Sequence, residues 1–406
     1  MKANNRNVIW IALLAGPPAL LLFGWLGLQA FITATSTPLH PNAQDVTSVI
    51  ASDPVPRWAG AVDEARQRVR AGLTAQNLPG MSVAVGAGQD IVWAEGFGWA
   101  DLDTRVPVSP NMRFRIGSTS IALTSVAVGR LLEMNRLNLD EKIQTYVPGF
   151  PEKPWPVTLR QLMGHLAGIS ADGGDEESLA PCARTAEGLQ RFEKRALMFE
   201  PGTQYRFSNY GWILVSAAVE AAAGERFFSW MRSQIFEPLG MSRTKPDSVT
   251  DLLPDRTTFY HPRFAADTRY GPEWVTEGDY SCFAGAGGLL STPSDLVRFG
   301  LAINRGELLQ PATLTLLQTS QRLSSGKETG YGLGWDLETV SIAGESTRQV
   351  GDDGEYFIGG SASFIILPER GIVVAVTTNT SFADTSSLAR ETAQIFATQG
   401  KVAARK

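Results

Sequence analysis

This sequence contains few histidine and cysteine residues, and its net charge is small. The chain has 406 residues, of which three are histidine and two are cysteine, and its net charge is −5. A chain without a surplus of lysine and arginine gives no reason to expect a nucleic-acid partner. With 43% hydrophobic and 19% charged residues, the composition is that of a globular protein that can bury one large core or two subdomains. We expect neither a metal nor another cofactor.

Charge is absent from one long stretch near the N-terminus. No charged residue occurs between Val8 and Phe31, a length that can cross a hydrocarbon core about 30 Å thick. We therefore predict an uncleaved membrane anchor at residues 8–31. Lys2 and Arg6 precede it, so the positive-inside tendency places the rest of the protein on the periplasmic or extracellular side of the cell membrane. A long signal peptide that is cut off is the alternative.

The rest of the chain divides into four segments, one before the anchor and three after it. A stretch rich in Thr, Ser, Pro and Ala follows it without a sustained hydrophobic period, which is typical of a linker. We predict a cytoplasmic N-terminus at 1–7, the linker at 32–57, one folded domain at 58–397 and a C-terminal tail at 398–406.

The two cysteines, Cys182 and Cys282, are 100 residues apart. Two free thiols are one reading of such a pair. In an oxidising compartment an even number of cysteines favours a disulfide. The predicted export therefore favours a Cys182–Cys282 bridge.

The folded region combines strand-like ends with a helical middle. Residues 81–86 and 91–98 are β-rich runs joined by a turn, which predicts a hairpin. Further strand-like runs lie near the C-terminus, at 331–337, 362–367 and 372–378. Helical patterns occupy residues 58–76, 118–135, 159–166, 186–197, 212–223, 227–236 and 385–398, and capping residues near 291–295 begin another helix. The pattern predicts an α/β (α+β) fold, with an antiparallel sheet built from both ends of the chain and an inserted helical subdomain.

Ser118 stands where a short strand-like run meets an apolar helix. A serine at a helix start can simply cap the free backbone N–H groups of the first turn. It can also act as a nucleophile when a base lies within reach. In Ser-x-x-Lys enzymes that base is a lysine three residues later, on the same helix face. Here that position holds Ile121, which cannot accept a proton.

Several segments together resemble one known family. They are residues 114–124, 162–169, 200–203, 205–212, 236–241, 285–295 and 368–372. In order and spacing they are similar to the serine β-lactamase and penicillin-binding-protein superfamily, especially class C β-lactamases, related esterases and membrane-anchored β-lactamase-like serine proteases. The likeness covers roughly residues 58–397 and implies a β-lactamase/transpeptidase-like fold.

The resemblance implies three catalytic motifs, and each is incomplete. In Ser-x-x-Lys the serine is Ser118, but Ile121 replaces the lysine. In Tyr-x-Asn, Phe207 replaces the tyrosine and Asn209 remains.

The third motif, Lys/His-x-Gly on a strand, falls at residues 352–354, where Asp352 replaces the base and Gly354 remains. A register shift of one or two residues is open there. As alternatives to these roles, Ile121 and Phe207 are core residues, Asn209 satisfies backbone groups, and Asp352 with Asp353 forms an exposed polar turn.

Two classes of function follow from these substitutions. In the family the lysine and tyrosine carry the serine's proton to the leaving group. Their joint loss favours a pseudoenzyme that keeps a cleft for a small-molecule or peptide ligand. The retained Ser118 and Asn209 support the alternative, an active or residual serine hydrolase that acts on an ester, peptide or β-lactam-like acyl group. In the second case Ser118 forms an acyl-enzyme.

The anchor can be tested directly. If residues 8–31 stay on the mature protein, the purified chain will have the full-length mass and will fractionate with membranes, because an apolar span of this length is stable in lipid. A soluble product that starts near residue 35 would show instead that the segment is cleaved.

Overall fold

A computed structural model describes residues 21–31, 33–170, 181–249, 255–276, 278–356 and 359–404. The predicted segment at 1–7 and most of the predicted anchor at 8–31 lie outside these ranges. Residues 21–31 are helical. Within the described ranges, no helix is both long enough and apolar enough to span a membrane.

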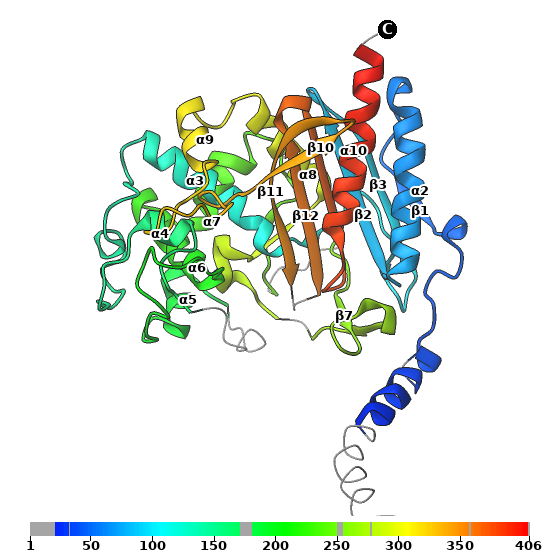
Figure 1. The fold of residues 1–406 in the computed structure, drawn as a ribbon, viewed down its shortest axis with the longest axis horizontal. Helices are drawn as coiled ribbons and strands as arrows, with labels where there is room; N and C mark the ends of the chain where they lie inside the picture. Colours follow the sequence, from blue (N-terminus) through cyan, green and yellow to red (C-terminus); the bar gives the residue numbers. More distant parts are fainter. Residues whose placement is uncertain are drawn as a thin grey trace, which may run out of the picture.

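A large antiparallel sheet forms the centre of the protein (Figure 1). Three N-terminal strands and four C-terminal strands meet where β2 pairs with β13, so that Met81 lies opposite Thr378. The predicted fold class, with a sheet built from both ends of the chain, is confirmed. In sheet order the strands are β1 (Ser48–Ile50), β3 (Asp90–Asp101), β2 (Gly80–Ala87), β13 (Ile372–Thr378), β12 (Gly360–Leu367), β11 (Glu345–Tyr356) and β10 (Asp336–Ile342), and β4 (Val106–Pro107) pairs with β3.

Both faces of the sheet are covered, and this explains the continuous apolar runs of its central strands. In β13, Val373 and Ala375 enter the core on the helical-subdomain side, whereas Val374 and Val376 enter the core on the other side. Helices α2 (Ala59–Ala75) and α10 (Thr385–Ala404) cover this second side and run next to each other in Figure 1. Helix α8 (Pro293–Asn304) packs on the first side.

The helical subdomain lies between the two groups of strands in sequence. Its helices are α3 (Ser120–Glu133), α4 (Leu159–Met163), α5 (Thr185–Gly188), α6 (Asn209–Ala223), α7 (Phe227–Met231) and α9 (Pro311–Leu317). A disulfide joins Cys182, ahead of α5, to Cys282, with their Cα atoms 4.9 Å apart. The predicted bridge is therefore confirmed.

Three local predictions were wrong. Residues 331–337 are mainly a loop that leads into β10, and the helix expected at 186–197 is only the short α5 followed by a 3-10 turn. Strand β11 was not predicted from its own residue pattern, and only the resemblance placed residues 352–354 on a strand. Its sequence is polar and contains two glycines, so it lacks the alternation of apolar residues that marks a strand. Hydrogen bonding to β10 over residues 345–351 and to β12 over residues 350–356 overrides that low propensity.

Two small sheets complete the fold. One is formed by β5 (Phe114–Arg115), β9 (Leu289–Ser291) and β6 (Lys245–Pro246), and the other by β7 (Tyr260–Pro262) and β8 (Pro272–Trp274).

A buried ion pair supports the turn that carries Ser118. Arg115 donates to Asp247 at 2.6 Å, and both side chains are 2% exposed. The rings of Phe259 and Tyr280 lie 4.0 and 4.3 Å from its guanidinium carbon. The guanidinium is thus fixed by charge and by aromatic faces.

Asp247→Asn will destabilise the protein by about 3–5 kcal/mol, because it leaves the buried Arg115 charge without its carboxylate. The matched control is Asp255→Asn, which removes the carboxylate partner of Arg243 where both side chains are partly exposed. That change should cost about 0–1 kcal/mol. Denaturant unfolding under non-reducing conditions measures both, and equal losses would contradict this role for the Arg115–Asp247 pair.

Candidate active site

Ser118 lies in a 3-10 turn, Gly117–Thr119, that leads into α3. The N-cap positions of this turn and of α3 are Ile116 and Thr119, so Ser118 is not an N-cap residue. Instead, its hydroxyl donates to the amide oxygen of Asn209 at 3.3 Å. Asn209 is the first residue of α6, which is capped by Ser208. Ser118 and Asn209 are 4% and 3% exposed, so the contact is shielded from water.

The position that corresponds to the family lysine belongs to the main core. Ile121 is fully buried in the cluster that also contains Leu123 and Val126 of the same helix. Helix α3 is buried on all sides over its first turns, because other elements surround it. This position therefore offers no group that could move a proton.

Phe207 is not a core residue, contrary to one of the alternatives above. Its side chain is 38% exposed, and its ring lies against the imidazole of His165 with centroids 4.5 Å apart. The Nδ1 atom of His165 accepts a hydrogen bond from the backbone N–H of Ser208 at 3.1 Å. The ring contact and this hydrogen bond tie the segment before α6 to the end of α4.

Strand β11 brings residues 352–354 against the Ser118 turn. A Cβ atom added to Gly354 would lie 2.3 Å from the carbonyl oxygen of Ile116 and 3.1 Å from the Ser118 nitrogen. Only glycine fits at that distance, because no side chain has room there. The hydroxyl of Thr119 also donates to the Asp352 carbonyl at 3.4 Å. The structure thus places the stretch assigned to the third motif beside the serine.

Asp352 and Asp353 lie within β11 rather than in an exposed turn. Asp352 is 4% exposed and pairs across the ladder with Phe364, whose side chain belongs to the core on the helical-subdomain side. Asp353 pairs with Ser363, whose hydroxyl contacts Thr385 at the start of α10. Neighbouring residues of a strand point to opposite faces. The Asp352 carboxyl therefore points toward the helical subdomain and the Asp353 carboxyl toward α10.

The Asp352 carboxyl has an unusual environment. Burial raises its pKa well above the ordinary value, and the negative charges of Asp336 and Asp353 add to this effect. The Tyr331 hydroxyl lies close enough to lower this pKa slightly, but Oδ2 of Asp352 and the Tyr331 hydroxyl both lack a hydrogen bond of normal geometry. Burial therefore favours the protonated carboxyl in the free protein.

Tyr331 is a site residue that sequence reasoning did not identify. It begins the loop Tyr-Gly-Leu-Gly-Trp at residues 331–335, which was mistaken for a strand. Ser125 of α3 holds this loop by donating to the Leu333 carbonyl at 2.6 Å and accepting from the Trp335 ring nitrogen at 3.0 Å. Two glycines between aromatic residues were the available signal, because they indicate a close-packed loop.

The other histidines lie elsewhere. His40 contacts the Pro79 carbonyl, and His261 is in β7. Among the described residues, no group of three or more His, Cys, Asp or Glu side chains could hold a metal ion.

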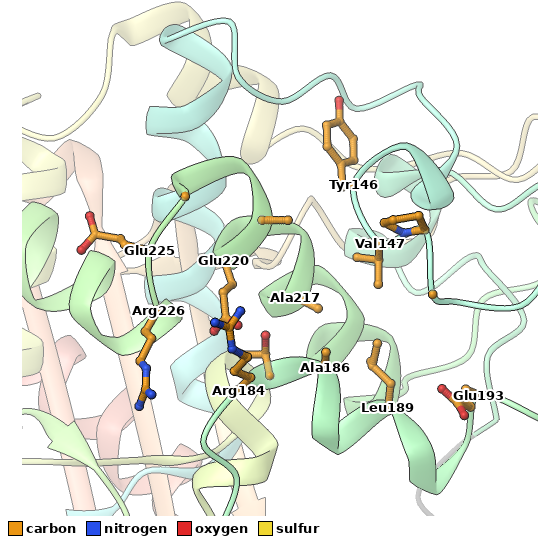
Figure 2. Close-up of a pocket in the computed structure, with 15 residues that line it drawn as sticks. Tyr146, Val147, Arg184, Ala186, Leu189, Glu193, Ala217, Glu220, Glu225 and Arg226 are labelled. Atoms are coloured by element: carbon orange, nitrogen blue, oxygen red, sulfur yellow. The ribbon is translucent and has the colours of Figure 1, made fainter.

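A separate hollow of about 590 Å³ lies in the helical subdomain (Figure 2). Ala217 and Glu220 of α6 line it together with Arg184, and neither Ser118 nor Asn209 does. It is therefore distinct from the serine site.

The pKa of His165 provides a test of whether its imidazole is buried in the folded protein. Complete burial lowers it from 6.5 to about 3. Between these values the unfolded chain binds the proton more readily, so the stability that neutral His165 contributes is present above pH 6.5 and is lost as the pH falls. The loss from this residue should reach about 2 kcal/mol at pH 5.

His165→Asn will therefore flatten the fall in unfolding free energy between pH 8 and pH 5. Asn tolerates the left-handed backbone at this position, where φ is 57°. Its side-chain oxygen can accept from Ser208 in place of Nδ1. His261→Asn is the matched control, and every other titrating group is shared by the two variants. If the unfolding free energy falls equally with pH in both variants, the lowered pKa of His165 is contradicted.

Comparison with known proteins identifies the family. The profile described as "Beta-lactamase" matches residues 65–398. The chain is 27% identical to "Serine beta-lactamase-like protein LACTB, mitochondrial" of Bos taurus, over 79% of this chain and 77% of that protein. It is 28% identical to "Penicillin-binding protein 4*" of Bacillus subtilis, over 66% of this chain and 62% of that protein.

Solved structures share the fold at lower sequence identity. An octameric penicillin-binding protein homologue from Pyrococcus abyssi has a TM-score of 0.68 at 24% identity, covering 81% of this chain and 75% of its own. FmtA from Staphylococcus aureus has a TM-score of 0.70 at 17% identity, covering 89% and 95%. The match to the family profile extends over most of the sequence, and the chain therefore belongs to the beta-lactamase family.

Proposed function

We propose that this protein is a ligand-binding member of the family that does not carry out acyl-enzyme turnover. The observation that carries the proposal is the hydrogen bond from Ser118 to Asn209. An amide oxygen can accept a hydrogen bond but cannot take the proton at neutral pH, and a serine without a base is a poor nucleophile. In an unrelated serine hydrolase, loss of the base costs about 10⁶-fold in turnover.

Among the residues that the structure describes, no side chain near Ser118 replaces the missing relay. Ile121 is aliphatic, and Phe207 has no hydroxyl. His165 stays neutral far below pH 7, and its Nδ1 is already occupied by Ser208. Burial raises the pKa of the Tyr205 hydroxyl, which makes it harder to ionise than an ordinary tyrosine. These features support binding without covalent chemistry.

A second candidate is residual hydrolysis at Ser118. The raised pKa of Asp352 favours it, because a carboxyl with a higher pKa is a stronger base once it is ionised. The close fit of Gly354 against the Ser118 turn also keeps the strand where the resemblance expects an oxyanion site. We rank this second, because burial disfavours the ionised form of the Asp352 carboxyl, which is the form that could act as a base.

The proposal includes location and partners. Residues 8–31 anchor the chain in the cell membrane with the folded domain outside the cytoplasm. The Cys182–Cys282 bridge supports an oxidising compartment. The partners we propose are the membrane, through the anchor, and a small molecule or peptide bound at the serine site.

A fluorophosphonate or fluorescent penicillin probe, read by intact mass, tests the chemistry. The unmodified protein should remain unlabelled. Ile121→Lys together with Phe207→Tyr restores both members of the relay and should give one label per chain, because the backbone around Ser118 is unchanged. Ile121→Lys alone should label poorly and destabilise the fold, since it buries a cation without a polar partner.

Controls separate the two candidates. Ser118→Ala in the double variant should abolish the label. Strong labelling of the unmodified protein at Ser118 would overturn the binding proposal. Loss of that labelling in Asp352→Asn would then identify Asp352 as the base.

A further inference from the structure

Aromatic rings gather beside the serine site. Tyr205, Phe207 and Tyr331 surround the imidazole of His165, with ring centroids 5.8, 4.5 and 4.8 Å from it. Tyr205 and Tyr331 also face each other at 5.9 Å. We call these three residues the aromatic cluster. Tyr205 and Phe207 are 40% and 38% exposed, so the cluster presents ring surface to solvent while Tyr331 is buried.

The Asp352 carboxyl adjoins this cluster. It lies beside the Tyr331 hydroxyl, and its charge also acts on Tyr205. The side chain is 96% buried, and Oδ2 has no hydrogen-bond partner among the described residues. A buried acceptor that lacks a partner costs about 1–3 kcal/mol of folding free energy. The fold therefore holds an acceptor that a ligand could satisfy.

Charges around Asp352 are predominantly negative. Asp336 of β10 and Asp353 of β11 both raise its pKa, and no cation acts on it among the described groups. Arg390 of α10 acts instead on Asp336 and Asp353, and Glu338 adds negative charge near the same two residues. An anionic ligand would be repelled here, whereas a cation would be attracted, most strongly by the carboxyl nearest to it.

We propose that the serine site recognises a ligand through an ammonium group, with Asp352 as its counter-ion and the aromatic cluster as its apolar wall. Ring faces attract cations, and the attraction is stronger in a partly desolvated site. The inference rests on the proposed function in that the ligand is bound reversibly at this site. Binding of the cation releases the Asp352 proton to solvent, which leaves a carboxylate paired with an ammonium.

A metal ion fits this arrangement poorly. Divalent metals need several oxygen or nitrogen ligands, and the described residues offer no group of three or more His, Cys, Asp or Glu side chains. One carboxyl beside Tyr331 and near Tyr205 is instead the composition of an ammonium site.

The test compares three probes of the same shape and different charge: benzylammonium, benzyl alcohol and benzoate. Each is titrated into the full-length protein at pH 7 and low salt, and binding is followed by ligand-observed NMR. We expect benzylammonium to bind at least about tenfold more tightly than benzyl alcohol, and benzoate to bind least. Asp352→Asn should remove the preference for the cation, and Tyr205→Leu should weaken benzylammonium binding about threefold.

Asp353→Asn is the matched control. It removes one carboxyl from the adjacent position of β11, on the face toward α10, and should change benzylammonium binding by less than about twofold. Equal losses in Asp352→Asn and Asp353→Asn would overturn the proposal in favour of a diffuse negative field. Equal binding of benzylammonium and benzyl alcohol by the unmodified protein would overturn it as well.

The same titration with Ser118→Ala separates this inference from the proposed function. A cation preference that persists without the hydroxyl supports recognition by Asp352 whatever the outcome of the probe labelling. Labelling of the unmodified protein together with an intact preference would overturn the binding-only function and leave the ammonium site standing.

Discussion

The geometry of the serine site depends on how closely β11 approaches the Ser118 turn. At Gly354 the two backbones touch with no room for a side chain. Hydrogen bonds to β12 hold residues 350–356 of β11, and hydrogen bonds to β10 hold residues 345–351. Because a strand held in a ladder cannot shift without breaking a row of hydrogen bonds, the site inherits its shape from the central sheet. The distances around Ser118 thus depend on the position of β11 in the central sheet.

The substitutions around the serine are physically consistent with one another. Ile121 merges with the core, and the ring of Phe207 rests on a neutral histidine. Losing both polar members of a relay avoids the unpaired buried group that losing one would leave. The resemblance implies basic groups around the serine, whereas this chain has a buried acid at residue 352. The chain therefore has an acidic group where the resemblance implies a basic one.

Sequence reasoning succeeded where apolar periodicity or spacing was strong. It found the β2–β3 hairpin, β13, the helix after Ser118 and the disulfide. It failed for β11, because a polar strand is specified by its two neighbours rather than by its own residues. That failure made Asp352 look like part of an exposed turn. Tyr331 was missed for a related reason, since only tertiary packing brings its loop next to α3 and to the Asp352 carboxyl.

The joining of β2 to β13 also has a consequence for synthesis of the protein. The N-terminal hairpin emerges from the ribosome first, yet one edge of β2 has no partner until the strand that ends at Thr378 is made. Unpaired edges of apolar strands are prone to pair with other chains. Contacts between distant parts of a sequence also slow folding. The sheet therefore closes only after Thr378 has been made, and until then the open edge of β2 can pair with other chains.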